Sequence, residues 1–176
     1  MNVKFLNPFV EAAADVLQSE CQLKVIRGNL TLQKSALTTE DVTVLISLVG
    51  QVQGVVLYSL SESTGINLVS RVMGQEFESF NSLAQSGVAE LGNVISGQAT
   101  IKLSTAGYSA NISPPTLING KGVTISTLDF SRVVIPLTTD AGELSVHLAL
   151  RESIPGVQST EFVPVKIPTP SPFGSE

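Results

Sequence analysis

SGVAELGNVISG, residues 86–97, lies within a segment whose hydrophobic periodicity predicts one long helix from Leu83 to Leu103. At about 100° per residue, a stripe roughly 60° wide collects four polar or small residues: Ser86, Glu90, Asn93 and Gly97. The opposite stripe, about 80° wide, is apolar: Ala84, Val88, Leu91, Ile95 and Ala99. The pattern predicts one face packed on a core and another that presents a carboxylate beside a carboxamide.

Two of the glycines in this helix lie close to Asn93, and each has an energetic cost. Gly92 and Gly97 destabilise a helix interior by roughly 1 kcal/mol each relative to alanine. Two such costs close to two polar side chains indicate that another surface approaches the helix closely.

Helix caps predict two further helices. Asn7 is expected as the cap of the first helix and Pro8 in its first turn, before apolar residues that continue to Leu17. A shorter helix is expected to begin after Ser61 and to end at Gly74.

The remaining apolar runs have the length and composition of strands. Residues 42–49 and 52–60 are predicted to form a hairpin joined by Gly50-Gln51. Other extended segments are expected at 23–37 (broken near Gly28), 108–113 (stopped by Pro114-Pro115), 123–129, 132–138 and 143–151. A helix, then strands, then two helices, then strands predicts an α+β layer structure rather than a repeating βαβ sheet.

Composition excludes several classes of partner. Hydrophobic residues make up 43% of the 176, charged residues 14%, and the net charge is −5. Ten scattered basic residues form no stripe for nucleic acid or for an anionic membrane surface. The surplus of apolar residues favours a subunit interface.

The chain reads as cytoplasmic. Cys21 is its single cysteine, which suits a reducing compartment, and is expected to be a small buried hydrophobe. No secretory signal opens the sequence, and the longest apolar runs are too short to span a bilayer.

Common catalytic motifs are absent. The sequence contains neither the Gly-x-x-x-x-Gly-Lys-Ser/Thr loop nor the Gly-x-Gly-x-x-Gly motif of nucleotide-binding proteins. One histidine and one cysteine cannot build a His/Cys zinc site. His147 is expected to be a satisfied structural residue, because no nucleophile elbow accompanies it. The helix face with Ser86, Glu90 and Asn93 is the remaining candidate for a functional site. Its spacing allows hydrogen bonds to a water and a partner's cation at once, but also fits a solvated helix face.

The helix resembles the signature helix of the CheC/CheX/FliY family of chemotaxis phosphatases, whose signature is Ser or Asp, three residues, Glu, two residues, Asn. The wider chain is most similar to the CheX branch, with GVVLYS (54–59), MG (73–74), ISPPT (112–116) and LSVHL (144–148) in the expected order. The resemblance predicts a CheX-like phosphatase domain over residues 1–152. Residues 153–176 are a proline-rich tail, expected to be extended or disordered.

This resemblance implies an antiparallel-rich sheet packed against two long helices. It also implies dephosphorylation of a CheY-like response regulator by in-line attack of water, with Mg²⁺ supplied by the regulator and no cofactor of the chain's own. Asn93 would orient the water, and Glu90 would engage the regulator's lysine. Ser86 would support Glu90 or the docked loop, and Gly92 and Gly97 would leave room for the regulator.

A second signature, which CheC-type members carry on an early helix, would fall here on Asn7, Glu11 and Ala14. Alanine replaces the asparagine, so a single working site is expected. The resemblance together with the apolar surplus predicts a C2 homodimer joined through edge strands. The alternatives are a non-catalytic adaptor that binds a regulator and a structural role in a flagellar switch.

Overall fold

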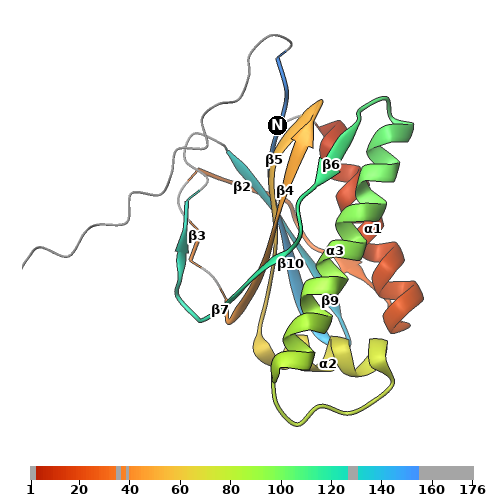
Figure 1. Ribbon diagram of the computed structural model, residues 1–176, viewed down its shortest axis with the longest axis vertical. Helices are drawn as coiled ribbons and strands as arrows, with labels where there is room; N and C mark the ends of the chain where they lie inside the picture. The colour runs from red at the N-terminus through yellow and green to blue at the C-terminus, as the bar shows by residue number, and fades with distance from the viewer. Residues whose placement is uncertain (1–2, 35–36, 39, 127–130, 155–176) are drawn as a thin grey trace, which may run out of the picture.

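The computed structural model describes residues 3–34, 37–38, 40–126 and 131–154 (Figure 1). The helices are α1 (Val3–Cys21), α2 (Glu62–Met73) and α3 (Ser82–Thr105). The strands are β1 (Ile26–Arg27), β2 (Thr31–Gln33), β3 (Leu37–Thr38), β4 (Val42–Gly50), β5 (Val52–Leu60), β6 (Ala110–Ile112), β7 (Thr116–Asn119), β8 (Thr124–Ile125), β9 (Arg132–Thr139) and β10 (Gly142–Glu152). Of the tail predicted over residues 153–176, only residues 153 and 154 belong to the described part of the chain.

The main sheet is antiparallel, in the order β1-β9-β10-β5-β4-β6, with β2 also on β9 and β7 also on β4. The predicted hairpin is confirmed, since β4 pairs with β5 from Val42 opposite Leu60 to Leu48 opposite Gly54. The break near Gly28 is confirmed as well, and there the Gly28 N–H donates to the Pro136 carbonyl at 2.8 Å. β3 and β8 form a separate two-stranded sheet.

The long helices α1 and α3 lie side by side against one face of the sheet, and α2 crosses near one end (Figure 1). Alternate residues of the central strands point at the helices and are buried, as with Val44 and Ile46 of β4 and Val146 and Leu148 of β10. This confirms the α+β class and the expected packing of the sheet on two long helices.

The first helix starts earlier than the sequence predicted. α1 begins at Val3, so Asn7 is not its cap and Pro8 lies inside the helix, where it removes one backbone hydrogen bond. Phe5 is buried and its ring meets Tyr108 edge to face, with the ring centroids 5.1 Å apart. Leu6 is buried too, and burial of these two side chains stabilises the additional turn.

The edge of the sheet beside β4 also differs from the prediction. Pro114 and Pro115 end β6 as expected, because they cannot donate to the ladder. The chain nevertheless stays on β4 through Ser113, whose Oγ accepts from the Ser47 N–H at 3.0 Å, and resumes as β7. The strand predicted over 123–129 reduces to β8, and residues 127–130 of that prediction lie outside the described residues.

Cys21 is buried at the end of α1, as expected of a small hydrophobe. Burial, with a contribution from Glu20, raises the pKa of its thiol to about 11, so the thiol is unreactive at neutral pH. In the described part of the chain, no helix has the combination of length and apolarity that a membrane crossing needs.

His147 is buried on the sheet face opposite the helices, between Leu57 of β5 and Val134 of β9. The His147 Nδ1 makes no hydrogen bond to the described residues. His147 is therefore buried as a structural residue would be, but the prediction that its hydrogen bonds are satisfied is wrong for this atom. Burial, together with the charge of Arg132, lowers the pKa of His147 to about 4.

Acid should therefore weaken the fold through His147. In the unfolded chain a histidine titrates near pH 6.5, so between pH 6.5 and 4 the unfolded state binds more protons and the free energy of unfolding falls as pH falls. This group should lower that free energy by about 2 kcal/mol between pH 7 and pH 5. Urea unfolding at both pH values measures the change, and His147→Met should lack it. An unchanged pH slope in that variant contradicts the assignment.

Candidate functional site

The site helix α3 begins one residue before its predicted start. Asn81 is its N-cap, and the Asn81 side chain accepts a hydrogen bond from the Ala84 N–H at 3.0 Å. An asparagine directly before a helical run is a capping signal, so this start could have been predicted from the sequence.

The two stripes of α3 lie as predicted. Every residue of the apolar stripe is buried against the sheet and the other helices: Ala84, Val88, Leu91, Ile95 and Ala99. On the opposite side Ser86 and Glu90 are exposed, whereas Asn93 and Gly97 are half-buried. The helix therefore presents these four residues on the side away from the core.

Glu90 and Asn93 are neighbours on this face, and the Asn93 Nδ2 donates to the Glu90 Oε2 at 3.4 Å. This long contact orients the amide but leaves the Asn93 Oδ1 and most of the carboxylate's acceptor capacity free. Among the described residues, no cation forms an ion pair with Glu90. The arrangement offers an amide that can hold a water and a carboxylate that can receive an external cation.

Ser86 does not hold Glu90 in this structure. Its Oγ donates to the Ser82 carbonyl one turn earlier, at 3.0 Å. The hydroxyl oxygen keeps its acceptor sites toward solvent, so an interaction of Ser86 with a docked partner stays a prediction.

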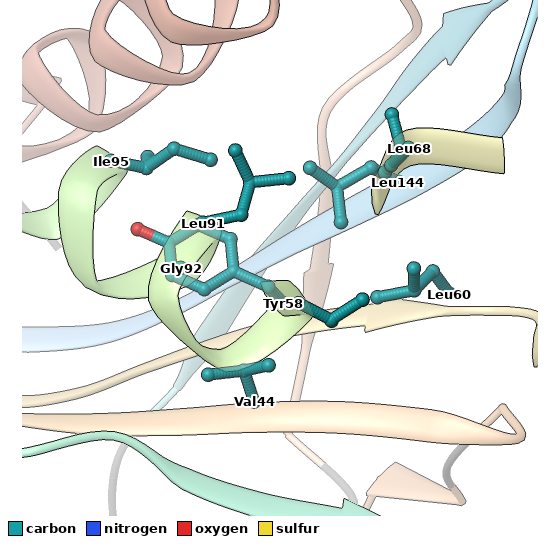
Figure 2. A pocket seen from close by; sticks show the side chains of 9 residues that line it. Val44, Tyr58, Leu60, Leu68, Leu91, Gly92, Ile95 and Leu144 are labelled. Atoms are coloured by element: carbon teal, nitrogen blue, oxygen red, sulfur yellow. The ribbon is translucent and has the colours of Figure 1, made fainter. Parts of the chain in front are cut away.

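Gly92 faces the sheet, and the expectation that it leaves room for a regulator is wrong. A Cβ added at Gly92 would lie 2.9 Å from the Val44 Cγ1 and 3.2 Å from the Tyr58 Cδ2. Gly92 and Tyr58 line a small apolar cavity of about 10 Å³ between α3 and the sheet, and Figure 2 shows how these two residues lie. The surface that approaches Gly92 is therefore the protein's own sheet, whereas Gly97 has no atom within 4 Å of an added Cβ and faces open space.

A buried hydrogen bond fixes α3 at the same place. The hydroxyl groups of Tyr58 and Ser96 lie 2.8 Å apart, and burial raises the pKa of Tyr58 well above its usual value. Ser96 lies one turn after Asn93, so this bond sets the rotation of α3 on the sheet and directs Asn93 outward.

Valine at the two glycines should separate these roles. Gly92→Val should lower the free energy of unfolding by about 2–3 kcal/mol, because a branched side chain overpacks Val44 and Tyr58. Gly97→Val, the same change in open space, should stay within about 0.5 kcal/mol of wild type, because valine and glycine have similar helix propensities. Chemical denaturation of both variants measures the difference, and equal losses would contradict the packing role of Gly92.

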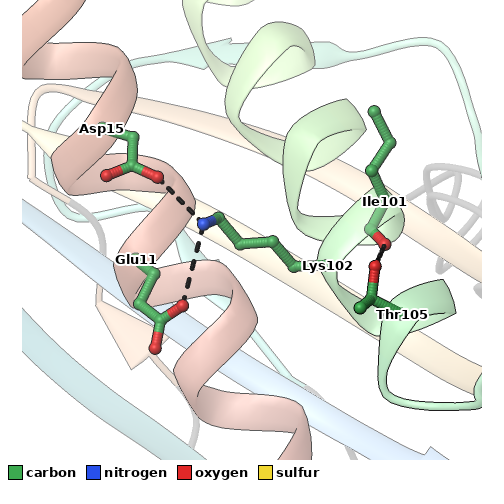
Figure 3. Close-up of polar contacts among 5 residues, drawn as sticks. All are labelled: Glu11, Asp15, Ile101, Lys102 and Thr105. Carbon is green, nitrogen blue, oxygen red and sulfur yellow. Dashed lines mark hydrogen bonds and ion pairs between the residues drawn. The ribbon is translucent and has the colours of Figure 1, made fainter.

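The α1 positions that correspond to a second signature do not form a second such site. Asn7 and Glu11 are exposed, but Ala14 supplies no amide. The Lys102 Nζ of α3 lies 2.9 Å from the Asp15 Oδ2 and 3.7 Å from the Glu11 Oε2 (Figure 3). The Glu11 carboxylate thus already has a cation within the chain, in contrast to Glu90.

Within residues 3–34, 37–38, 40–126 and 131–154, no three His, Cys, Asp or Glu side chains gather closely enough to hold a metal ion.

The sequence matches the family model for chemotaxis phosphatase CheX over residues 42–138, more than half of the chain. It is also similar to the CheY-P phosphatase CheX of Thermotoga maritima. The two are 24% identical over 153 residues, which make up 86% of this chain and 98% of the relative.

Solved structures share the fold. A CheC-like superfamily protein from Shewanella sp. PV-4 has a TM-score of 0.78 and 28% identity, and the match covers 86% of this chain and 99% of that one. The CheX–CheY–BeF3–Mg²⁺ complex from Borrelia burgdorferi contains a chain with a TM-score of 0.72 and 26% identity, covering 84% of this chain and 98% of that one.

Proposed function

This chain belongs to the chemotaxis phosphatase CheX family, and we propose that it dephosphorylates a CheY-like response regulator through Glu90 and Asn93. The observation that carries the assignment is the position of these two residues on the side of α3 away from the core, within hydrogen-bonding distance of each other. Glu90 is exposed there and Asn93 is half-buried. Eight of the other residues of this helix are buried in the chain's own core.

The reaction is hydrolysis of an acyl phosphate. A water attacks the phosphorus in line with the bond to the aspartate oxygen, that bond breaks, and aspartate and inorganic phosphate are released. The regulator supplies Mg²⁺ and a lysine that balance the charge of the phosphoryl group. Asn93 orients the attacking water, because an amide bonds to the nucleophile without adding negative charge beside the phosphate.

Glu90 contributes to binding of the regulator. A carboxylate next to a phosphoryl group is repelled unless a cation lies between them, and the chain provides Glu90 with none among the described residues. The regulator's active-site lysine is the matching cation, and a charge-assisted bond to it fixes the orientation of the complex.

A decay assay tests the proposal. The full chain is mixed with a phosphorylated CheY-like receiver domain and Mg²⁺, and loss of the aspartyl phosphate is followed against the receiver alone. Faster decay is the expected result. A complex that forms without faster decay would overturn the proposal in favour of the adaptor, the alternative function considered for this chain.

We also propose that the chain forms a homodimer through the edge of the sheet at β1 and β2. Both strands are short and pair only with β9 among the described residues, and three large apolar side chains are exposed there: Ile26, Leu30 and Leu32. The single cysteine and the nature of the substrate support a cytoplasmic location.

Light scattering at micromolar concentration should give twice the mass of one chain. Leu32→Lys, which places a charge on this edge, should give the mass of one chain, because an unpaired charge at a sheet edge opposes strand pairing. A wild-type monomer, or a dimer that survives the lysine, would contradict this interface.

A further inference from the structure

A stripe of residues on α3 runs through Glu90 and reaches exposed residues near both ends of the helix. Six residues follow each other at spacings of four and three: Leu83, Gly87, Glu90, Val94, Gly97 and Ile101. At 100° per residue they fall within about 80° of the helix circumference, which is the pattern of a packing seam. In this protein Leu83, Glu90 and Ile101 of the seam are exposed, and Val94 and Gly97 are half-buried. Gly87 packs against α2, where an added Cβ would lie 2.9 Å from the Val69 Cγ1.

The two ends of the stripe are apolar and exposed. Leu83 is 49% exposed and Ile101 is 68% exposed. Figure 3 shows Ile101 extending from α3 on the side away from Lys102 and its acidic partners. At the other end, Met73 of α2, itself exposed, extends the apolar surface, since its Cε would lie 3.6 Å from a Cβ added at Gly87.

The stripe carries a single charge. Glu90 and Lys102 are the only charged residues of α3, and Lys102 is engaged by Asp15 and Glu11. A partner that binds over this face removes water from the Glu90 carboxylate, which lies between the aliphatic side chains of Leu83 and Ile101. This desolvation is favourable only if the partner places a cation opposite Glu90. The complementary surface is apolar with one central positive charge.

We propose that Leu83 and Ile101 are docking contacts for the phosphorylated response regulator, seated on apolar patches that flank its phosphoaspartate and lysine. This rests on the proposed function. Along the helix axis Leu83 lies about 10 Å before Glu90 and Ile101 about 12 Å after Asn93, which fixes where the receiver's patches lie.

A second copy of this chain does not suit the same face. Twofold packing of two such stripes about their middle would bring the two Glu90 carboxylates together without a cation between them. The receiver, which supplies that cation, is the occupant that the charge pattern favours.

Glutamine at both positions tests the contacts, because it is polar and has the helix propensity of leucine. Leu83→Gln and Ile101→Gln should each raise the KM for the phosphorylated receiver by about 5–10-fold, and the double variant by about 30–100-fold, because the two positions are far apart. The kcat should stay within about twofold, since docking contacts are equally strong before and during the reaction. Titration with beryllofluoride-activated receiver should show the same loss in affinity.

Val49→Gln is the matched control, since Val49 is 60% exposed but lies on the sheet face away from α3. It should leave KM unchanged. Unchanged KM in both α3 variants, an equal rise in the control, or a fall in kcat without a rise in KM would each overturn the docking role. Absence of activity in the wild-type chain would instead overturn the proposed function, so the two failures are distinguishable.

Discussion

Asn93→Ala should slow dephosphorylation of the regulator by roughly 10²-fold or more, the usual effect of losing one positioned hydrogen-bonding group. The loss should lie in kcat, because the amide acts on the attacking water, which needs orientation only for the reaction itself. The fold should be unaffected. Within the described part of the chain, the Asn93 side chain makes one hydrogen bond, to Glu90 at 3.4 Å, and alanine is a better helix former.

Single-turnover decay of the phosphorylated receiver measures this effect. Gln98→Ala is the matched control, because it removes another half-buried amide from α3 on a different face of the helix. The control should keep the wild-type rate. A wild-type rate in Asn93→Ala would remove the amide from the mechanism.

The parts of the fold that follow from local chemistry could be predicted from the sequence. Ser61 caps α2 by accepting from the Thr64 N–H, and Gly74 ends it in the left-handed conformation at a φ of 64°. Both effects act within one turn of the chain. The β4–β5 hairpin is equally local, since its two strands are joined by Gln51.

The parts that depend on distant contacts could not be predicted in this way. The start of α1 is set by where Phe5 packs, and its partner Tyr108 is more than a hundred residues away. β7 forms because the unpaired edge of β4 continues past the position where Pro114 and Pro115 end β6. Neither the two prolines nor the four residues of β7 indicate this pairing in the sequence. Tertiary packing overrides local propensity in both cases.

The face of the site could be predicted because helical periodicity assigns each residue a direction. Exposure of Glu90 and burial of Leu91 both follow from the pattern. The same periodicity contained a signal about Gly92 that the sequence analysis missed. Gly92 falls only about 20° beyond the apolar stripe, next to Ala99, whereas Gly97 falls within the polar stripe. The packing partners of Gly92, Val44 and Tyr58, required the structure.

Glu90→Ala should weaken binding to the activated regulator by roughly 30-fold or more, because truncating one member of a desolvated charge pair leaves the regulator's lysine without its partner. Asn93→Ala should change this affinity much less, since its amide serves the water. Titration of both variants with beryllofluoride-activated receiver and Mg²⁺ compares them directly. Equal affinities would contradict the pairing of Glu90 with a cation.

Glu90→Gln separates charge from shape at the same position. It keeps the length of the side chain and an oxygen that accepts from Asn93, so the orientation of the amide is retained. The Glu90→Gln variant should nevertheless bind the receiver nearly as weakly as Glu90→Ala does, because a neutral amide cannot form a charge pair with the receiver's lysine. Added salt should narrow the gap between wild type and both variants, because ions screen the attraction that brings the two surfaces together. A glutamine variant with wild-type affinity would show that a neutral hydrogen bond suffices, and the lone charge on this helix face would then need another explanation.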